Sequence, residues 1–238
     1  MKYSKKDKCQ YRRKLELSMS ARYIPKRNNL HERRNTMQER AEKTRQKILD
    51  AATKLFSSRG FSGTVIDDIA AEAGVNKQRI YAYFKNKNSL FESVTAEIFN
   101  ASNHYDKKLL TLNEDDIPSM TLTVMNHYLS TYKRRPEFWR LIAWANLEFG
   151  DVLKSIKGIK SESLEHIRKL YQQGIEKKIF RNPAISFETY IYILWSATFF
   201  YNSNRSTLRQ SFGPELFNEK NRTVLFDEIT TLFQAVDL

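Results

Sequence analysis

The stretch from Phe61 to Phe84 constrains the fold more than any other part of the sequence, because it predicts two short helices joined by a tight corner. Thr64 is a residue type that caps helix N-termini, and Asp67, three residues later, completes the pattern of a capping box. Gly74 stands where a left-handed residue would end the first helix and turn the chain. Apolar residues recur at four-residue steps and predict the buried face of that helix: Val65, Ile69 and Ala73.

The second helix of this corner is predicted to run from Asn76 to Phe84, with the Asn76 side chain as its N-cap. Since successive residues step about 100° around a helix, placing Ile80 and Phe84 inward points other residues outward. The outward-facing group is Lys77, Gln78, Arg79, Tyr81 and Ala82. Arginine, glutamine and a methyl group match base edges in the DNA major groove, so the pattern indicates a helix-turn-helix with a reading helix. The alternative interpretation is an ordinary helical corner whose polar face is solvated.

The charge of the sequence is uneven in a way that favours nucleic acid as a partner. Residues 1–90 contain 22 Lys and Arg against 9 Asp and Glu, which accounts for the net charge of +13 of the whole chain. Residues 91–238 contain 18 of each and are neutral. A basic first part on a neutral second part is typical of a DNA-binding protein with a separate second domain, although basic segments can also serve only solubility.

Composition excludes several other classes of protein. With 7 Gly and 5 Pro in 238 residues, the chain is predicted to be mostly helical and to hold one or two domains. Cys9 is the only cysteine, which excludes a disulfide framework or a Cys-rich zinc site and fits a reducing cytoplasm. No apolar run reaches the ~18 residues of a membrane span, and the N-terminus lacks the apolar core of a secretory signal. We therefore expect a cytoplasmic protein.

The sequence contains no pattern typical of catalysis or of metal binding. His104, His127 and His166 are scattered, without the four-residue spacing of metal-ligating histidines on a helix. The acidic stretch Thr111–Ile117 lacks the spacing of an EF-hand and is predicted to be a loop. Ser-His-Asp, Cys-His and glycine-rich phosphate-binding patterns are also missing. We expect neither an enzyme nor a bound cofactor or metal.

A basic, apolar-poor extension, Met1–Arg40, precedes the helix-turn-helix and is predicted to be disordered or loosely helical. Its functional interpretation is an arm that follows the phosphate backbone or enters the minor groove beside the bound site. The alternatives are a solvated tail, or a start codon assigned too far upstream, with Met37 as the natural first residue.

Hydrophobic periodicity predicts further helices on both sides of the corner. They are expected at Ala41–Arg59, Lys87 to about Leu110, Pro118–Arg134, Phe138–Phe149, Ser161–Lys178, Phe187–Asn204 and Leu216–Val236. The helix Phe138–Phe149 is apolar nearly all round, which is typical of a helix at the centre of a protein. The last two helices have wide apolar faces, and exposed faces of that kind usually indicate a partner.

Four segments resemble the tetracycline-repressor (TetR) family of bacterial regulators. They are Thr44–Phe56, Gly60–Thr64, the Ile69–Val75 core and Ile80–Lys87, and the resemblance extends from Glu42 to about Ile98. It implies an all-α fold with the extension at 1–40, a three-helix helix-turn-helix DNA-binding domain at 41–102, and an effector-binding and dimerisation domain at 103–238.

The same resemblance implies roles for individual residues of the DNA-binding domain. Residues at positions that touch phosphates are Thr64, Tyr81, Tyr83 and Lys87. Those at positions that can reach bases are Lys77, Gln78 and Arg79, and Asn76 belongs to the same DNA-binding set. Ala82 departs from the larger residue often found at its position.

The resemblance also implies that the middle helices enclose a pocket for a small-molecule effector. Candidate lining residues are His104, Met125, Tyr128, Trp139, Arg140, Trp144, Asn146, Tyr171, Trp195, Phe199 and Asn202. Aromatic residues at helical spacing mostly form plain core, so each of these aromatics has that alternative. Arg140 could anchor an anionic ligand, or it could pair with Glu137 or Glu148.

In the TetR family the last two helices pair with those of a second copy as a four-helix bundle, and the resemblance implies the same here. The candidate interface residues are Ile191, Leu194, Trp195, Thr198, Leu225, Ile229, Leu232 and Phe233. A two-fold dimer would place its reading helices in successive major grooves about 34–36 Å apart, on a near-palindromic operator.

These observations predict a ligand-responsive, sequence-specific DNA-binding transcription regulator, most simply a repressor, that acts as a homodimer. The expected partners are double-stranded operator DNA, a second copy of the chain and a small-molecule effector, with no membrane. The competing hypothesis is an effector-independent DNA-binding or architectural protein that relies on its basic arm. An enzyme of the helical class has no support beyond the expected pocket.

Overall fold

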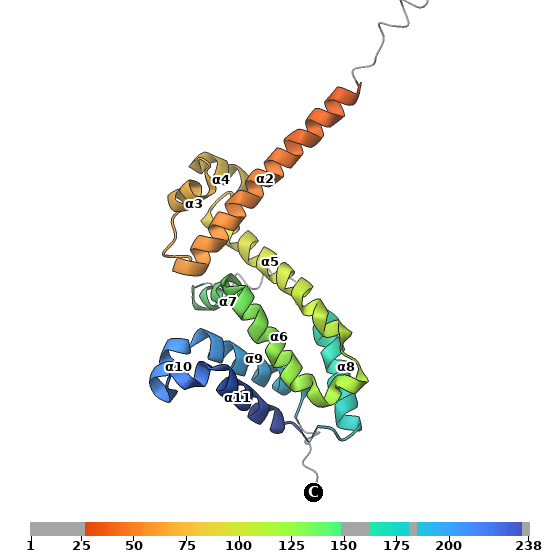
Figure 1. Cartoon of the computed structure of the whole chain (residues 1–238). Helices are drawn as coiled ribbons and strands as arrows, with labels where there is room; N and C mark the ends of the chain where they lie inside the picture. Colours follow the sequence, from red (N-terminus) through yellow and green to blue (C-terminus); the bar gives the residue numbers. More distant parts are fainter. Residues whose placement is uncertain (1–26, 149–161, 181–184, 235–238) are drawn as a thin grey trace, which may run out of the picture. The chain divides into compact units, whose positions relative to one another are not determined.

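Helices make up almost all of the described structure, which confirms the all-α prediction (Figure 1). The computed structural model describes residues 27–148, 162–180 and 185–234, without the side chains of residues 27–35 and 102–104. The helices are α2 (Arg27–Arg59), α3 (Ile66–Ala73), α4 (Lys77–Phe84), α5 (Lys87–Asp106), α6 (Met120–Arg134), α7 (Pro136–Glu148), α8 (Glu162–Glu176), α9 (Phe187–Ser203), α10 (Arg205–Phe212) and α11 (Glu219–Thr231). Short 3-10 turns are η1 (Lys107–Thr111), η2 (Glu114–Ser119) and η4 (Pro214–Phe217).

The chain divides into two compact units, residues 1–47 and 48–238. Within the second unit we call residues 48–100 the head, which holds α3, α4 and most of α5, and residues 101–234 the body. No strand forms in the described ranges, where an isolated β-bridge joins Phe180 to Gln234.

The corner predicted in the head is present as α3 followed by α4, but its first helix starts differently from the prediction. Val65 occupies the N-cap position of α3 without a side-chain cap, and it is 52% exposed. Thr64 is instead fully buried, and its hydroxyl donates a hydrogen bond to the carbonyl oxygen of Gly60 at 2.8 Å. The predicted capping box of Thr64 and Asp67 is therefore wrong. The buried face of α3 is formed by Ile66, Ile69 and Ala70.

The second helix of the corner begins and packs as the local sequence predicts. Gly74 adopts a φ of +64°, a left-handed conformation that glycine takes at no steric cost, and so turns the chain after α3. The Asn76 side chain caps α4 by accepting a hydrogen bond from the backbone N–H of Arg79 at 2.8 Å. Ile80 and Phe84 are buried, so α4 is anchored by the apolar pair that the sequence indicates.

Helix boundaries differ from the predictions at both ends of the described chain. α2 begins at Arg27 rather than Ala41, so the extension is helical from there, while residues 1–26 lie outside the described residues. The last predicted helix, Leu216–Val236, is present as α11, but it runs only from Glu219 to Thr231. Gly213, at a φ of +85°, ends α10, and α11 starts only after Asn218, whose side chain caps it.

The acidic loop predicted at Thr111–Ile117 is partly helical. Asn113 and Asp116 form a reciprocal capping box that starts the 3-10 turn η2, with the Asn113 N–H donating to Asp116 Oδ2 at 2.9 Å. The helix predicted from Lys87 to about Leu110 changes to 3-10 geometry after Asp106.

Buried apolar side chains form two clusters, one in the head and one in the body. The head cluster contains residues of α2 to α5, and it also contains Leu141 and Ala145 of α7. The body cluster contains residues of η1, η2, α6, α8, α9 and α11, and Phe138 and Trp139 of α7 pack against it. α7 therefore contributes to both clusters. The sequence predicted that this helix lies at the centre of the protein, but it is not buried on all sides, because Leu147 is 78% exposed.

Tyr190 on α9 lies at the centre of the body cluster, where α6 runs alongside α9 and α11 (Figure 1). Its ring centroid is 4.5 Å from that of Tyr171 on α8 and 5.0 Å from that of Phe233. Its hydroxyl shares a 3.1 Å hydrogen bond with Thr121 on α6. Burial raises the pKa of the Tyr190 phenol far above its ordinary value, so the side chain stays neutral and ties three helices together.

Candidate nucleic-acid interface

The outward face of α4 carries the residues that the 100° step predicts. Lys77, Gln78, Arg79 and Ala82 are exposed, and Tyr81 is 41% exposed. Within the described residues, neither the Gln78 amide nor the Arg79 guanidinium has a side-chain partner. A rigid, capped helix thus presents an amide, a guanidinium and a methyl group to solvent, which are the groups that read base edges.

Lys77 differs from its two neighbours because it already has a partner on α3. Its ammonium lies 3.0 Å from a carboxylate oxygen of Asp67. The hydrogen bond to Asp67 raises the pKa of Lys77, and the attraction between the two charges adds to that. Both side chains are largely exposed, so the pair is weak, but a phosphate would have to compete with Asp67 for this cation.

The four residues that the family resemblance places near phosphates occupy different environments. Tyr81 is exposed on α4, and Tyr83 is half-buried beside Phe84. Thr64 is buried with its hydroxyl bound to Gly60, so a side-chain contact with a phosphate is not open to it in this structure. The Lys87 ammonium lies 4.1 Å from the centroid of the Phe61 ring, and burial lowers the pKa of Lys87.

The loop before α3 is held by the far end of α7, a contact between residues far apart in the sequence. The backbone N–H of Ser62 donates a hydrogen bond to Glu148 Oε2 at 3.0 Å. The ring of Trp144 lies against Gly60, where an added Cβ would be only 2.8 Å from its nearest ring atom. Sequence reasoning missed this contact, although Glu148 is one of the few charged residues on an otherwise apolar helix.

The predicted effector-pocket residues occupy several different environments in the described structure, and none of them lines the cavity described below. Met125, Tyr128 and Tyr171 are buried in the body cluster, and burial raises the pKa of the Tyr128 phenol. Trp195 is partly exposed and lies edge-on to Tyr128, while Trp139, Trp144, Phe199 and Asn202 are half-buried. His104 lies in α5, but its side chain is outside the described residues.

Two polar candidates for the pocket point to solvent instead. Asn146 is exposed, and its amide donates to the carbonyl oxygen of Ile142 one turn back. Arg140 is exposed and lies over the ring of Trp139, with its guanidinium carbon 5.3 Å from the ring centroid. The predicted pairing of Arg140 is wrong, because Glu137 pairs with Arg135 at 2.8 Å and Glu148 binds the loop before α3.

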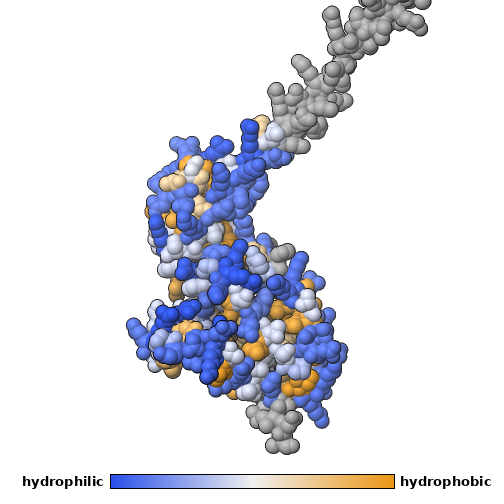
Figure 2. Space-filling model, in the orientation of Figure 1, coloured by the Kyte–Doolittle hydropathy of each residue, from blue (hydrophilic) through white to orange (hydrophobic). Residues whose placement is uncertain are grey.

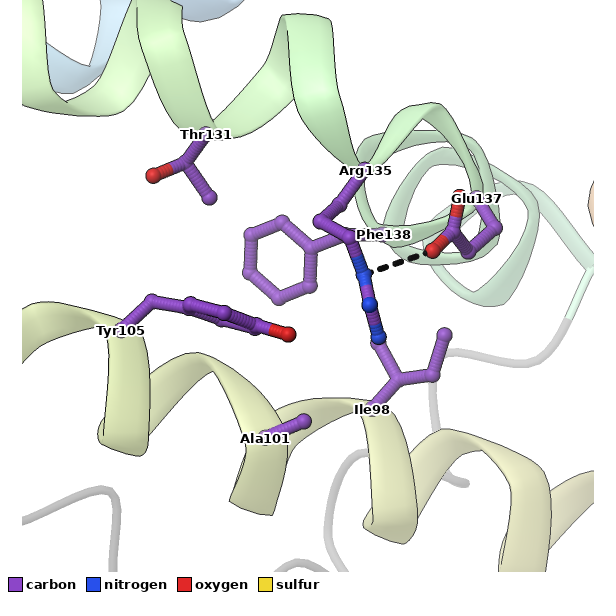
Figure 3. Close-up of a pocket in the computed structure, with 7 residues that line it drawn as sticks. All are labelled: Ile98, Ala101, Tyr105, Thr131, Arg135, Glu137 and Phe138. Atoms are coloured by element: carbon purple, nitrogen blue, oxygen red, sulfur yellow. Dashed lines mark ion pairs between the residues drawn. The ribbon is translucent and has the colours of Figure 1, made fainter.

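A cavity that the sequence did not indicate lies between α5, α6 and the start of α7 (Figure 3). It is lined by Ile98, Ala101, Tyr105, Thr131, Arg135, Glu137 and Phe138. The Arg135 guanidinium carbon is 5.2 Å from the Tyr105 ring centroid, and the same guanidinium pairs with Glu137. The Thr131 hydroxyl is buried and has no hydrogen-bond partner among the side chains and backbone that the structure describes. The enclosed part of this cavity has room for about one water molecule.

Four of the eight predicted dimer-interface residues are buried within the single chain. They are Ile191, Leu194, Thr198 and Phe233. Trp195 and Leu232 are exposed, and Leu225 and Ile229 are half-buried. The most exposed apolar residues of α9 are Tyr192, at 68%, and Phe200, at 53%, about two turns apart on one broad face of the helix.

His127 and Asp106 form a nearly buried pair at the junction of α5 and α6, with 2.8 Å between Nε2 and Oδ1. Among the residues with described side chains, no group of three or more His, Cys, Asp or Glu side chains could hold a metal ion. No helix in the described part of the chain is long and apolar enough to cross a membrane.

Comparison with known proteins decides the family. Residues 48–94 match the model of the bacterial regulatory proteins of the tetR family, and residues 121–231 match a tetracyclin repressor-like C-terminal domain. The chain is 31% identical over 188 residues to the HTH-type transcriptional repressor NicS of Pseudomonas putida, covering 76% of this chain and 86% of that protein. The chain belongs to the tetR family of bacterial regulatory proteins. It is a DNA-binding transcription regulator with a helix-turn-helix head.

Another curated relative and two solved structures match about four fifths of this chain. IcaR of Staphylococcus aureus, a negative transcriptional regulator of a biofilm operon, is 22% identical over 196 residues, or 79% of this chain and 96% of its own. The crystal structure of PfmR from Thermus thermophilus has a TM-score of 0.58 at 15% identity and covers 82% of this chain and 97% of its own. The crystal structure of the regulator SCO4942 from Streptomyces coelicolor has a TM-score of 0.55 at 22% identity and covers 80% of this chain and 98% of its own. These likenesses confirm the fold on both sides of the head–body boundary.

Proposed function

We propose that this chain is a ligand-responsive transcriptional repressor that binds a near-palindromic operator as a homodimer and reads bases with the exposed face of α4. The observation that carries the proposal is the arrangement of α4. Ile80 and Phe84 anchor the helix in the head cluster, while Gln78 and Arg79 stand free in solvent. The names of the relatives NicS and IcaR, a repressor and a negative regulator, favour repression over activation.

Dimerisation is proposed through the outward faces of α9 and α11. Tyr192 and Phe200 project from α9. Val224 is exposed on α11 and Leu232 is exposed just after its end, eight residues later, which is the spacing of one broad helical face. Exposed apolar side chains in rows on neighbouring helices favour a self-complementary, two-fold contact. The two reading helices would then address equivalent half-sites.

Effector control is proposed to act through α7, because that helix shares residues with both apolar clusters. The cavity of Arg135 and Glu137 lies at its N-terminal end, and Glu148 binds the loop before α3 at its C-terminal end. A ligand that prefers one position of α7 would shift the balance between two arrangements of the head. Since the cavity is small in this structure, a ligand would enter only as α5, α6 and α7 separate.

The test begins with selection of bound sequences from a random DNA pool by the full chain. Arg79→Ala is then expected to relax the preference at one base position per half-site, by about 1–3 kcal/mol of discrimination. Lys107→Ala, a control at an exposed lysine of η1, should leave the selected sequence unchanged. An unchanged sequence preference in Arg79→Ala would contradict the assignment of α4 as the reading helix.

The competing hypothesis is an effector-independent or architectural DNA-binding protein. It predicts binding that is insensitive to sequence, and thermal unfolding that is unaffected by any member of a small-molecule library. The repressor proposal predicts the opposite for both measurements, namely one enriched motif and at least one compound that raises the unfolding temperature and releases DNA.

A further inference from the structure

The folded head has little electrostatic attraction for a polyanion. Residues 48–100 contain six Lys and Arg and six Asp and Glu, so their net charge is zero. Three of the six cations are in ion pairs within the head: Lys54 with Glu72 at 2.6 Å, Arg59 with Asp68 at 2.6 Å, and Lys77 with Asp67 at 3.0 Å. A fourth, Lys87, lies over the Phe61 ring. Since phosphate neutralisation supplies much of the affinity of DNA-binding proteins, the head by itself lacks a large source of affinity.

The missing positive charge is concentrated in residues 1–47, the first of the two units, which we call the extension from here on. Residues 1–47 contain 16 Lys and Arg against 5 Asp and Glu, a net charge of +11 out of the +13 of the whole chain. Residues 27–47, the part of the extension that the structure describes, are helical and hold 7 basic and 3 acidic residues. The folded head and body together contribute only +2, from 24 basic and 22 acidic residues in 48–238.

The helical extension also has no apolar stripe that would bury against protein. Its apolar residues are Leu30, Met37 and Ala41, and Met37 is 72% exposed. Figure 2 shows that the coloured part of the extension is mostly hydrophilic. A helix that is polar all round is stabilised by side-chain pairs or by a polar partner rather than by a core.

The charges of the extension are sorted around the helix. At about 100° per residue, Glu39 and Glu42 fall within an arc of about 60°, and the four cations of residues 36–47 fall within an arc of about 200° on the other side. Arg40 and Lys47, seven residues apart, lie only about 20° from each other within this basic face. A segregated basic face of this kind matches a line of phosphates better than a solvated surface of mixed charge would.

We propose that the helical extension Arg27–Lys47 is a second DNA contact, which binds the phosphate backbone beside the operator and supplies most of the salt-dependent affinity. It leaves sequence preference to α4. The inference rests on the proposed function only in taking DNA as the ligand of the head. Double-stranded DNA is favoured over other polyanions because the extension is continuous in sequence with the helix that enters the head, so operator binding brings it to DNA.

The test compares the full chain with a variant in which four cations of the basic face are neutralised: Arg33→Gln, Arg34→Gln, Arg40→Gln and Lys43→Gln. Glutamine retains helix propensity, and circular dichroism checks that the helix content is unchanged. Each lost phosphate contact lowers the slope of log affinity against log salt by about 0.9, so the slope should fall by about 3.6 per protomer. Between 50 and 200 mM salt, the parent should therefore lose on the order of 10²-fold more DNA affinity per protomer than the variant does. The ratio of operator affinity to random-DNA affinity should be the same in both proteins.

A matched control removes the same charge from exposed lysines of the body: Lys107→Gln, Lys108→Gln, Lys169→Gln and Lys220→Gln. We expect its salt slope to equal that of the parent. An unchanged slope in the extension variant, or an equal drop in the control, would overturn the proposal. The proposal would also be overturned if the extension variant lost binding to phosphatidylserine vesicles while its slope of log DNA affinity against log salt stayed unchanged. That result would make the extension a membrane contact. If selection yields no operator, the proposed function fails, while the slope on random DNA still decides the role of the extension.

Discussion

Substituting Gly60 by alanine tests whether α7 holds the loop before the helix-turn-helix. Gly60 has a φ of +74°, and an added Cβ would lie 2.8–3.0 Å from three ring atoms of Trp144. The left-handed conformation costs an alanine about 1–2 kcal/mol. Overpacking against the half-buried Trp144 ring adds about 1–3 kcal/mol. Gly60→Ala should therefore lower the free energy of unfolding by roughly 2–5 kcal/mol, measured by urea denaturation.

Gly74→Ala is the matched control for this experiment. Gly74 has a similar φ of +64°, but nothing lies within 4 Å of its added Cβ, so only the conformational cost of about 1–2 kcal/mol applies. Trp144→Leu in the Gly60→Ala background should relieve the overlap, giving a favourable coupling energy in a double-mutant cycle. Equal destabilisation by Gly60→Ala and Gly74→Ala, together with additive effects in the cycle, would refute the contact between Trp144 and the loop.

Three further predictions follow from the described contacts. Asn76→Ala removes the cap of α4 and should cost about 1 kcal/mol of stability and weaken operator binding, whereas Asn86→Ala, at the cap of α5, should cost a similar amount with less effect on base preference. Thr64→Val leaves the Gly60 carbonyl without its buried donor and should destabilise the head by about 1–3 kcal/mol, yet leave the salt slope of DNA binding unchanged; a flatter slope would restore Thr64 as a phosphate contact. Burial raises the pKa of Tyr132 to about 12, so its phenol ionises in the unfolded chain from about pH 10 while the folded chain stays neutral. Stability should therefore fall between pH 10 and 12, and Tyr132→Phe should make that fall shallower by up to about 3 kcal/mol in urea titrations at pH 9 and 12; the same loss of stability with pH in the variant and the parent would contradict the burial argument.

The reading helix was predictable because its signals are local. Asn76 as cap, Gly74 as the left-handed turn and the pair Ile80 and Phe84 lie within eleven residues, and a helix of known pitch then fixes which residues face outward. Thr64 shows where local patterns fail. A threonine three residues before an aspartate fits a capping box, but the same hydroxyl can donate a hydrogen bond to a carbonyl four residues back. Because Thr64 is buried, its hydroxyl makes the second of these bonds.

The body was harder to predict because its contacts join distant residues. Glu148 and Ser62 are 86 residues apart, and no local pattern links a glutamate on an apolar helix to a backbone N–H in the loop before α3. A helix that is apolar nearly all round, such as α9, has no clear phase, so the sequence could not tell the core face of Leu194 and Thr198 from the exposed face of Tyr192 and Phe200. The cavity of Arg135 lies at a helix corner, where periodicity carries no information.

Disulfide cross-linking tests the central claim, that the exposed face of α4 enters the major groove of the operator. The chain has one cysteine, so a Cys9→Ser background makes a single introduced thiol informative. With an operator that carries a thiol tethered to one major-groove base, Ala82→Cys should form a cross-link at one position per half-site. Thr111→Cys, at an exposed site on η1, should form none. Cross-linking from Thr111→Cys but not from Ala82→Cys would contradict the account.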